Sequence, residues 1–252
     1  MEQSDQLLSA ILDIGEAMLE AGGEVSRVEK TLTLLCRAYG YTQINAYATR
    51  YSIIVTVTDG SRRVVTQTRR PTRWSTDMHR IEELNALSRQ LCANTASPEE
   101  IAAALERISR TPTYPRWMIF LVYLVAPLSL SLFFGGQLRD ALASSLCGAV
   151  IWAMEQLGQY LEVKKLVHCF FCAITAGLST FFVVRIFPSL QLDKVIIGDI
   201  MLLVPGLALT TALRDIINGD EITGLLGFFD AILRAVIIAF GVALPTLLGG
   251  VL

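Results

Sequence analysis

The sequence lacks the motifs that mark several large classes of enzyme and pump. It has no Walker loop, no zinc-protease helix and no Gly-x-Ser-x-Gly elbow. Without a nucleotide-binding loop, the chain is not expected to drive ATP-powered pumping. No catalytic residue and no cofactor are predicted.

Charge, histidine and paired cysteine are also scarce. Only 17% of the 252 residues are charged and the net charge is −2, which argues against a nucleic-acid partner because such a partner requires a basic face. The five cysteines are odd in number and are interpreted as reduced thiols. His168 to Cys172, HCFFC, imitates a metal or redox motif. Since it lies in an apolar run with no second ligand pair, no metal site is predicted.

Apolar residues are abundant but unevenly distributed. They make up 53% of the chain, which is high for a soluble protein. Residues 1–116 contain 28 charged residues, whereas the 136 residues that follow contain 16. The N-terminus has no basic region ahead of its apolar residues, so it is not predicted to be a signal peptide. The pattern predicts a soluble domain over 1–113 and a transmembrane domain over 114–252.

The first domain has the pattern of a small α+β fold. Two amphipathic helices are predicted on either side of Gly22-Gly23, because glycine ends a helix cheaply. Asp59-Gly60 separates two runs rich in β-branched residues, which is a strong hairpin signal. Residues 44–49 can add a third strand, and two further helices are predicted over 77–91 and 97–109.

The second domain is predicted to be all-α with five transmembrane helices, at about 117–134, 138–160, 166–187, 195–213 and 222–248. Their connections carry six Lys/Arg residues on the side of the first domain and three on the other. The positive-inside rule therefore predicts a cytoplasmic N-terminal domain and a C-terminus outside.

The fourth predicted span carries the most informative polar residues. Asp199 is the single charge within 195–213, and an ionisable residue inside a membrane segment is a functional-site hypothesis by default. Pro205 breaks the helix and frees a carbonyl near mid-span. Asp199, Gly206 and Thr210 are spaced to share one helix face, apart from the kink. The alternative is a kinked packing helix with Asp199 in the headgroup region.

Charges at the ends of the membrane domain suggest further pathway residues. Arg214 and Asp215 follow the fourth span directly and are predicted to form a cytoplasmic gate. Asp230 and Arg234 lie one turn apart in the fifth span. They form either a self-neutralising structural pair or a site where Arg234 binds a substrate carboxylate through two parallel hydrogen bonds.

A second candidate site lies in the first domain. It comprises an acidic and basic segment at the start of the second helix together with the domain's one histidine: Gly23, Glu24, Arg27, Glu29 and His79. These residue types can perform acid–base work. The alternative is a solvated helix start and a surface histidine.

Several stretches together resemble a known family. They are AGGEVSRVE, DMHRIEE, YPRW and LLVPGLALTTALRDIINGD followed by ITG. In combination they resemble the threonine/serine exporter family of bacteria, in particular the larger subunit of its split, two-component branch, and the resemblance covers nearly the whole chain. The family's motifs match Gly23-Glu24 with Arg27 and Glu29, Met78-His79, and Pro205-Gly206. Gly23 stands where many relatives have alanine.

The resemblance implies secondary export of a small polar metabolite across the inner membrane, either threonine and serine or a dicarboxylate such as succinate. It also implies a small second membrane subunit of about five further spans, because the chain ends soon after the fifth predicted span. The leading hypothesis is thus an exporter subunit in the lipid bilayer for a carboxylate-bearing solute, within a hetero- or homo-oligomer. Asp199 would be an outer-side gating or proton-exchange group, with the substrate site at the Pro205 break. The alternatives are a membrane-anchored enzyme using Glu24, Glu29 and His79, or a scaffold that transports nothing.

Overall fold

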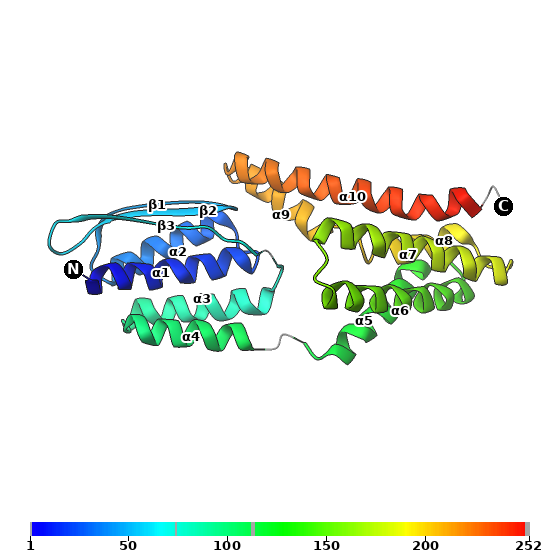
Figure 1. Ribbon diagram of the computed structural model, residues 1–252, viewed down its shortest axis with the longest axis horizontal. Coiled ribbons are helices and arrows are strands. Elements are labelled where there is room, and N and C mark those ends of the chain that lie inside the picture. Colours follow the sequence, from blue (N-terminus) through cyan, green and yellow to red (C-terminus); the bar gives the residue numbers. More distant parts are fainter. Residues whose placement is uncertain (1, 74, 112–113, 250–252) are drawn as a thin grey trace. The chain divides into compact units, whose positions relative to one another are not determined.

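The computed structural model describes residues 2–73, 75–111 and 114–249 (Figure 1). The predicted domain ends at residues 1, 113 and 252 lie outside these ranges. Within the described residues the chain forms ten helices and three strands: α1 (Glu2–Glu20), α2 (Val25–Ala38), β1 (Thr42–Thr49), β2 (Ser52–Thr58), β3 (Val64–Arg69), α3 (Met78–Ala93), α4 (Pro98–Arg110), α5 (Arg116–Phe133), α6 (Leu138–Tyr160), α7 (Lys165–Ile186), α8 (Leu192–Ile200), α9 (Gly206–Ile217) and α10 (Glu221–Gly249).

These elements fall into two compact units. The first comprises residues 1–113 together with 211–226, so it includes the last turns of α9 and the start of α10. The second comprises residues 114–210 and 227–252. We refer to them below as the N-terminal unit and the helical unit.

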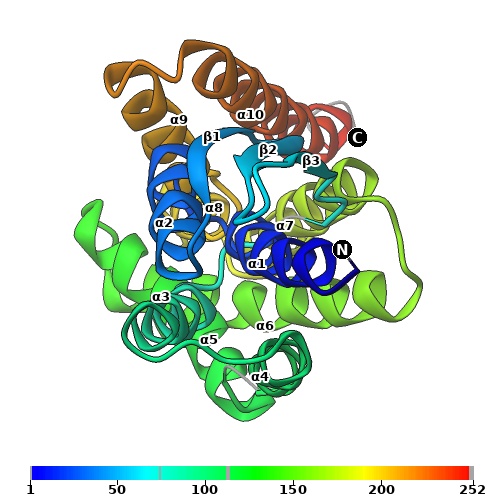
Figure 2. The same cartoon turned by 90° about the vertical axis from the view of Figure 1, so that its left-hand side faces the viewer.

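The N-terminal unit is layered. Its antiparallel sheet has the order β1-β2-β3 and packs on α1 and α2, whose other side is covered by α3 and α4 (Figures 1 and 2). The inner faces of these elements form one apolar core that includes Leu8, Ile11, Leu32, Ile53 and Leu84, each fully buried. The predicted N-terminal α+β region is confirmed.

Turns in this unit follow the residues that the sequence supplies. Gly22 adopts φ +92° after α1, a conformation that glycine tolerates without a Cβ clash. The hairpin predicted at Asp59-Gly60 is present, with Thr58 paired to Val64 across the turn. The Asp59 carboxylate accepts hydrogen bonds from the backbone N–H groups of Ser61 and Arg63, which fixes the loop.

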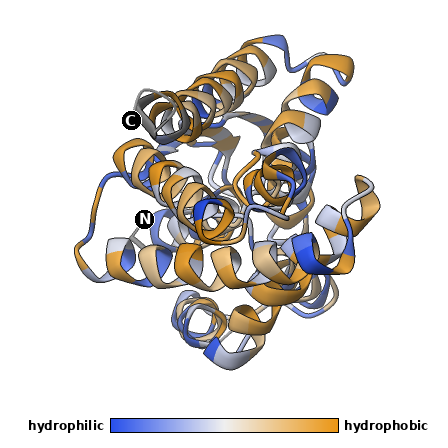
Figure 3. Ribbon diagram, turned by 90° about the vertical axis from the view of Figure 1, so that its right-hand side faces the viewer, coloured by the Kyte–Doolittle hydropathy of each residue, from blue (hydrophilic) through white to orange (hydrophobic). Residues whose placement is uncertain are grey.

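The helical unit contains α5 to α8 and most of α10. Small residues bring its helices close together: a Cβ on Gly148 of α6 would lie 2.0 Å from the Tyr123 carbonyl oxygen of α5, and one on Gly177 of α7 would lie 2.8 Å from the Val242 carbonyl oxygen of α10. Large apolar side chains face outward, among them Phe133, Phe182 and Phe240. Hydrophobic colour covers most of this unit in Figure 3. Close glycine contacts and apolar outer surfaces are typical of membrane helix bundles.

The prediction of five transmembrane helices is wrong. Among the described residues, three helices are long and apolar enough to cross a membrane: Arg116–Phe133, Lys165–Ile186 and Glu221–Pro245. They correspond to the first, third and fifth predicted spans. The Lys/Arg count that predicted the orientation of the chain assumed five membrane crossings. With three candidate spans, that count no longer applies as it was made.

The other two predicted spans fail for different reasons. The segment 138–160 is one helix, α6, but it contains Arg139, Asp140 and Glu155 among many alanine, serine and glycine residues, which lowers its hydropathy. The segment 195–213 is not one helix. It divides into α8, of 9 residues, and the longer α9, of 12, and at 1.5 Å per residue neither can span a core of about 30 Å.

Candidate functional site

A buried carboxylate lies where three helices of the helical unit meet. The side chain of Asp199, on α8, is fully buried. The Ser144 hydroxyl of α6 donates to Asp199 Oδ1 at 2.8 Å, and the Thr180 hydroxyl of α7 donates to Oδ2 at 2.7 Å. Each carboxylate oxygen therefore has its own hydroxyl donor. No ion pair to Asp199 is found within the described parts of the chain.

Close backbone approach makes this arrangement possible. A Cβ on Gly198 would lie 2.4 Å from Ser144 Oγ and 2.7 Å from the Pro127 carbonyl oxygen of α5, so α8 fits against α5 and α6 only because Gly198 has no side chain. Pro127 cannot donate a backbone hydrogen bond, which loosens α5 at this level. The bare backbone at Gly198 thus allows Ser144 and Asp199 to come into contact.

The predicted common face of Asp199, Gly206 and Thr210 is interrupted. Helix α8 ends at Ile200, and residues 201–205 separate it from α9. Thr210 is exposed, and its hydroxyl donates to the Gly206 and Leu207 carbonyls of its own helix at 3.1 and 3.0 Å. A Cβ on Gly206 would meet no atom within 4 Å, so Gly206 itself is not closely packed, whereas Leu202 and Leu203 of the break pack against the apolar core of the helical unit.

The predicted gate residues meet the predicted motif of the N-terminal unit. Arg214 Nη1 lies 2.6 Å from Glu24 Oε1, and Glu24 is the residue directly before α2. Asp215 lies beside the same group, outside the three candidate spans. Burial, together with the nearby Asp220 and Glu24, raises the pKa of Asp215 to about 6, against the lowering effect of Arg50 and Arg214. This end of α9 is therefore a charged cluster in which the pKa of Asp215 lies closer to neutral pH than that of an ordinary aspartate.

Asp230 and Arg234 form the i,i+4 pair that their spacing allows, with Arg234 Nη2 donating to Asp230 Oδ2 at 2.9 Å. Both side chains are about one third exposed, at 31%. The Arg234 Nε is buried and has no hydrogen-bond partner among the described residues. The pair therefore leaves one guanidinium donor unused.

The remaining candidates of the N-terminal unit are dispersed. Glu29 Oε1 accepts a 2.7 Å hydrogen bond from the Ala48 backbone and so ties α2 to β1. His79 lies 3.9 Å from Glu83 on its own helix, and Arg27 is exposed. Gly23 continues the turn after α1, with its N–H donating to the Met18 carbonyl. Among the described residues these contacts do not assemble Glu24, Glu29 and His79 into an acid–base site.

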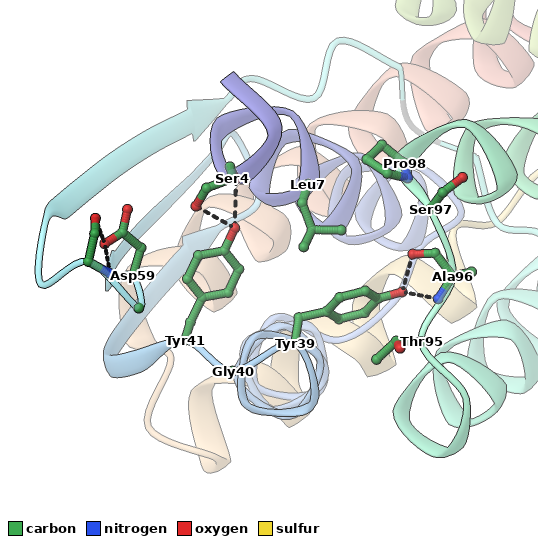
Figure 4. Close-up of a pocket in the computed structure, with 12 residues that line it drawn as sticks. Ser4, Leu7, Tyr39, Gly40, Tyr41, Asp59, Thr95, Ala96, Ser97 and Pro98 are labelled. Atoms are coloured by element: carbon green, nitrogen blue, oxygen red, sulfur yellow. Dashed lines mark hydrogen bonds between the residues drawn. The ribbon is translucent and has the colours of Figure 1, made fainter. Parts of the chain in front are cut away.

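A cleft of about 580 Å³ opens at another place in the N-terminal unit (Figure 4). Two tyrosines line it, and both are already engaged: the Tyr39 hydroxyl donates to the Ala96 carbonyl, and the Tyr41 hydroxyl donates to the Ser4 carbonyl. None of the predicted site residues lines this cleft.

Sequence reasoning did not select Ser144 or Thr180 as functional residues. Serine and threonine are common in membrane helices as packing residues, so their type alone gives no signal. The one usable clue was the lone carboxylate, because a buried carboxylate needs donors and hydroxyls are the donors that apolar helices supply.

Comparison with known proteins identifies the family. The protein-family model described as "Putative threonine/serine exporter" matches residues 9–248 of the chain. The chain belongs to the threonine/serine exporter family. The resemblance noted from the sequence motifs is thereby confirmed, and the apolar helices of the chain agree with a multi-pass membrane protein.

Two curated relatives of this threonine/serine exporter family member refine the comparison. A "Probable threonine/serine exporter" of Mycobacterium tuberculosis is 24% identical over 243 residues, which cover 94% of this chain but 45% of the relative. The chain thus spans about half the length of that relative. A "Probable succinate transporter subunit YjjP" of Klebsiella aerogenes is 22% identical over 236 residues, covering 92% of this chain and 90% of the relative.

Both relatives are named as transport proteins rather than enzymes, in agreement with the expectation that this family member is not an enzyme. The word "subunit" in the second name also agrees with the expected dependence on a partner. No solved structure matches the chain.

Proposed function

We propose that this chain is one subunit of a secondary exporter for a small carboxylate-bearing metabolite, in a bacterial inner membrane with its N-terminal unit in the cytoplasm. The names of the two relatives support the solute class, since threonine, serine and succinate all carry a carboxylate. The second name supports a two-subunit assembly. A further membrane subunit would complete the pathway that three candidate spans provide only in part.

The observation that carries this proposal is the environment of Asp199. Its carboxylate is fully buried and receives two hydroxyl hydrogen bonds, but it has no ion pair within the described residues. A carboxylate buried in such a place carries a high free-energy cost when it is ionised, so we expect a proton or a cation to neutralise its charge. Asp199 is therefore suited to take up and release the coupling ion while the hydroxyls of α6 and α7 hold it in place.

Arg234 is the proposed partner of the substrate carboxylate. Its guanidinium keeps one buried Nε–H unused while another nitrogen bonds Asp230. Arginine binds a carboxylate through two parallel N–H donors. An incoming carboxylate would use Nε and one terminal nitrogen, and Asp230 would be displaced from the pair. Asp230 then acts as the internal competitor that occupies Arg234 when substrate is absent.

The break between α8 and α9 is the proposed moving part. Asp199 lies at the end of α8, directly before residues 201–205, whose backbone is not helical. Broken helices near transport sites recur in secondary transporters because a short connection can move without unfolding a helix. Pro205 and Gly206 would serve as the hinge, and Arg214 with Asp215 as the cytoplasmic gate.

Solute efflux from vesicles tests the proposal. The chain is reconstituted with and without a second family subunit, and efflux of labelled succinate is compared with that of serine. Asp199→Asn removes the exchangeable proton, and Arg234→Ala removes the proposed carboxylate partner. Both variants are expected to lose at least about 90% of efflux, because the first removes the proposed proton site and the second leaves the substrate carboxylate without its partner, which costs about 2–5 kcal/mol.

Two exposed residues supply matched controls. Asp193→Asn changes a carboxylate that is 71% exposed at the start of α8, and Arg185→Ala changes an exposed arginine near the end of α7. Both are expected to retain efflux. Full efflux by Asp199→Asn and Arg234→Ala, in protein that still inserts, would remove their assigned roles. If substitution of every polar residue of the helical unit left efflux intact, the chain would be a scaffold for its partner.

A further inference from the structure

Three potential metal ligands meet between α6 and α7, away from Asp199. His168 Nε2 lies 2.7 Å from Glu155 Oε2, and Cys172 Sγ lies 3.6 Å from that nitrogen and 3.7 Å from that oxygen. All three ligand atoms fall within 4.8 Å of one another. We infer that Glu155, His168 and Cys172 form a zinc-binding site that ties α6 to α7.

The distances fit the edges of a zinc coordination tetrahedron. With zinc–ligand bonds of about 2.0–2.3 Å, neighbouring ligand atoms lie about 3.4–3.6 Å apart. The two edges to the sulfur, at 3.6 and 3.7 Å, are already close to this length. The Glu155–His168 edge is at hydrogen-bond distance and opens by about 0.7 Å when a metal replaces the shared proton. Water completes the fourth position.

The ligand types select the metal. A thiolate and an imidazole suit zinc and similar borderline or soft cations, whereas magnesium and calcium prefer oxygen ligands throughout. Binding requires the Cys172 thiol to lose its proton, and it requires a neutral His168 whose proton is on Nδ1, so that Nε2 and the Glu155 carboxylate are both free of hydrogen. Glu155 and His168 are 28% and 16% exposed, so the protein does not enclose the three ligands completely.

The surroundings of the three ligands hold them in this arrangement. A Cβ on Gly158 would lie 1.8 Å from His168 Nδ1, so the imidazole rests directly on the bare backbone of α6. That contact turns Nε2 toward Glu155. The Gln159 amide donates to Glu155 Oε1 at 3.2 Å, which leaves Oε2 for the metal. Outer contacts of this kind orient ligands in zinc sites.

The sequence led to the opposite expectation for a clear reason. His168 and Cys172 lie one turn apart on α7 and supply two ligands, which are too few for a zinc site. The third ligand, Glu155, lies 13 residues before His168 on another helix, so the spacing within the HCFFC motif gives no sign of it. Packing of α6 against α7 supplies the missing ligand.

Cobalt binding to the purified full chain tests the site, with Co²⁺ as the probe. The protein in detergent is reduced, stripped with a chelator and titrated with Co²⁺, and Zn²⁺ is then added to displace it. One Co²⁺ per chain is expected, with the intense visible bands of tetrahedral cobalt and a thiolate-to-cobalt charge-transfer band. Cys172→Ser, His168→Ala and Glu155→Gln are each expected to weaken binding by more than the roughly 10–100-fold that loss of an outer-shell contact costs.

Two controls and one steric variant decide the assignment. Cys169→Ser alters the adjacent thiol and His79→Ala alters the chain's other histidine, and both are expected to bind as the unaltered protein does. Gly158→Ala keeps all three ligands but occupies the place of the imidazole, so it is expected to lose tight binding. Size-exclusion profiles identify variants that are not folded, and Cys172→Ala then replaces Cys172→Ser. Absence of the charge-transfer band in folded, unaltered protein would overturn the inference, as would a band that persists in the Cys172 variant or disappears with Cys169→Ser.

Discussion

At the scale of single residues, Asp199 shows how an apolar bundle can keep a carboxylate. Two hydroxyls from different helices bond its two oxygens, and Gly198 allows α8 to approach closely enough for Ser144 to reach it. Each hydrogen bond to a charged acceptor contributes about 1.5–3 kcal/mol. The position of α8 is thus as important to the site as the carboxylate itself.

Replacing Gly198 tests this dependence on close approach. Gly198→Ala inserts a methyl group 2.7 Å from the Pro127 carbonyl oxygen, which belongs to the backbone and cannot rotate away. We expect a loss of about 1–3 kcal/mol in the free energy of unfolding, typical of overpacking, together with loss of efflux. Thermal unfolding of the purified protein in detergent provides the measurement.

Gly206→Ala is the matched control for this prediction. A Cβ at Gly206 meets no atom within 4 Å, so its effect on the melting temperature is expected to be small. Equal melting temperatures for the two variants would show that α8 has room to shift. In that case the contact between Gly198 and Ser144 would not determine the geometry of Asp199.

At the scale of elements, the break between α8 and α9 separates what the sequence could predict from what it could not. Residues 195–213 contain enough apolar side chains for a full span, and a hydropathy count registers side chains only. The backbone turns away after Ile200, where Leu203 N–H bonds the Ile200 carbonyl three residues back rather than four. Pro205 indicated a kink in the helix, but the residues around it did not show whether the helix kinks there or ends before it.

Elements defined by local rules were predictable, and contacts between elements were not. The Asp59-Gly60 hairpin and the capping box of α4, Ser97 with Glu100, follow from residues within four positions of each other. Ser144 lies 55 residues from Asp199, and the pairing of Glu24 with Arg214 joins residues 190 positions apart. A single sequence contains no local signal for contacts of that range.

The Glu24–Arg214 ion pair can be distinguished by experiment from a pair between Glu24 and Arg27, whose spacing of three residues would also allow a contact. A double-mutant cycle with Glu24→Gln and Arg214→Gln is expected to give a coupling energy of up to about 1 kcal/mol, the range for an ion pair with one exposed partner. The same cycle with Arg27→Gln, three residues from Glu24 on α2, is expected to give none. Urea unfolding of the purified chain provides the free energies. Coupling to Arg27 in place of Arg214 would contradict the assigned pair.

At the scale of the whole molecule, the N-terminal unit includes part of the polypeptide that follows the Asp199 helix. Residues 211–226 belong to it by their contacts, and they carry Arg214 and Asp215. A chain segment that leaves the helical unit and joins the N-terminal unit provides a covalent route between the two. If α9 moves in the proposed transport cycle, Glu24 is expected to be affected through its contact with Arg214.

The proposed orientation can be tested with a residue that the chain already contains. Cys92, in α3 of the N-terminal unit, is exposed, whereas Cys36, Cys147 and Cys172 are buried and Cys169 is partly covered. A maleimide that cannot cross membranes should therefore react first with Cys92. Burial raises the pKa of the Cys92 thiol, so labelling is best performed slightly above neutral pH, where more thiolate is present.

If the N-terminal unit is cytoplasmic, this label should not react with intact cells whose outer envelope has been permeabilised. It should react with inside-out membrane vesicles, where the same thiol faces the medium. Cys92→Ser removes the exposed thiol, and labelling of the vesicles is expected to fall to the background set by the buried cysteines. Labelling of Cys92 in the cells but not in the vesicles would place the N-terminal unit on the outer side. The Glu24–Arg214 cluster, which belongs to that unit, would then have to be an outer gate. Asp199 would then have to exchange its proton with the cytoplasmic side of the membrane instead of the outer side.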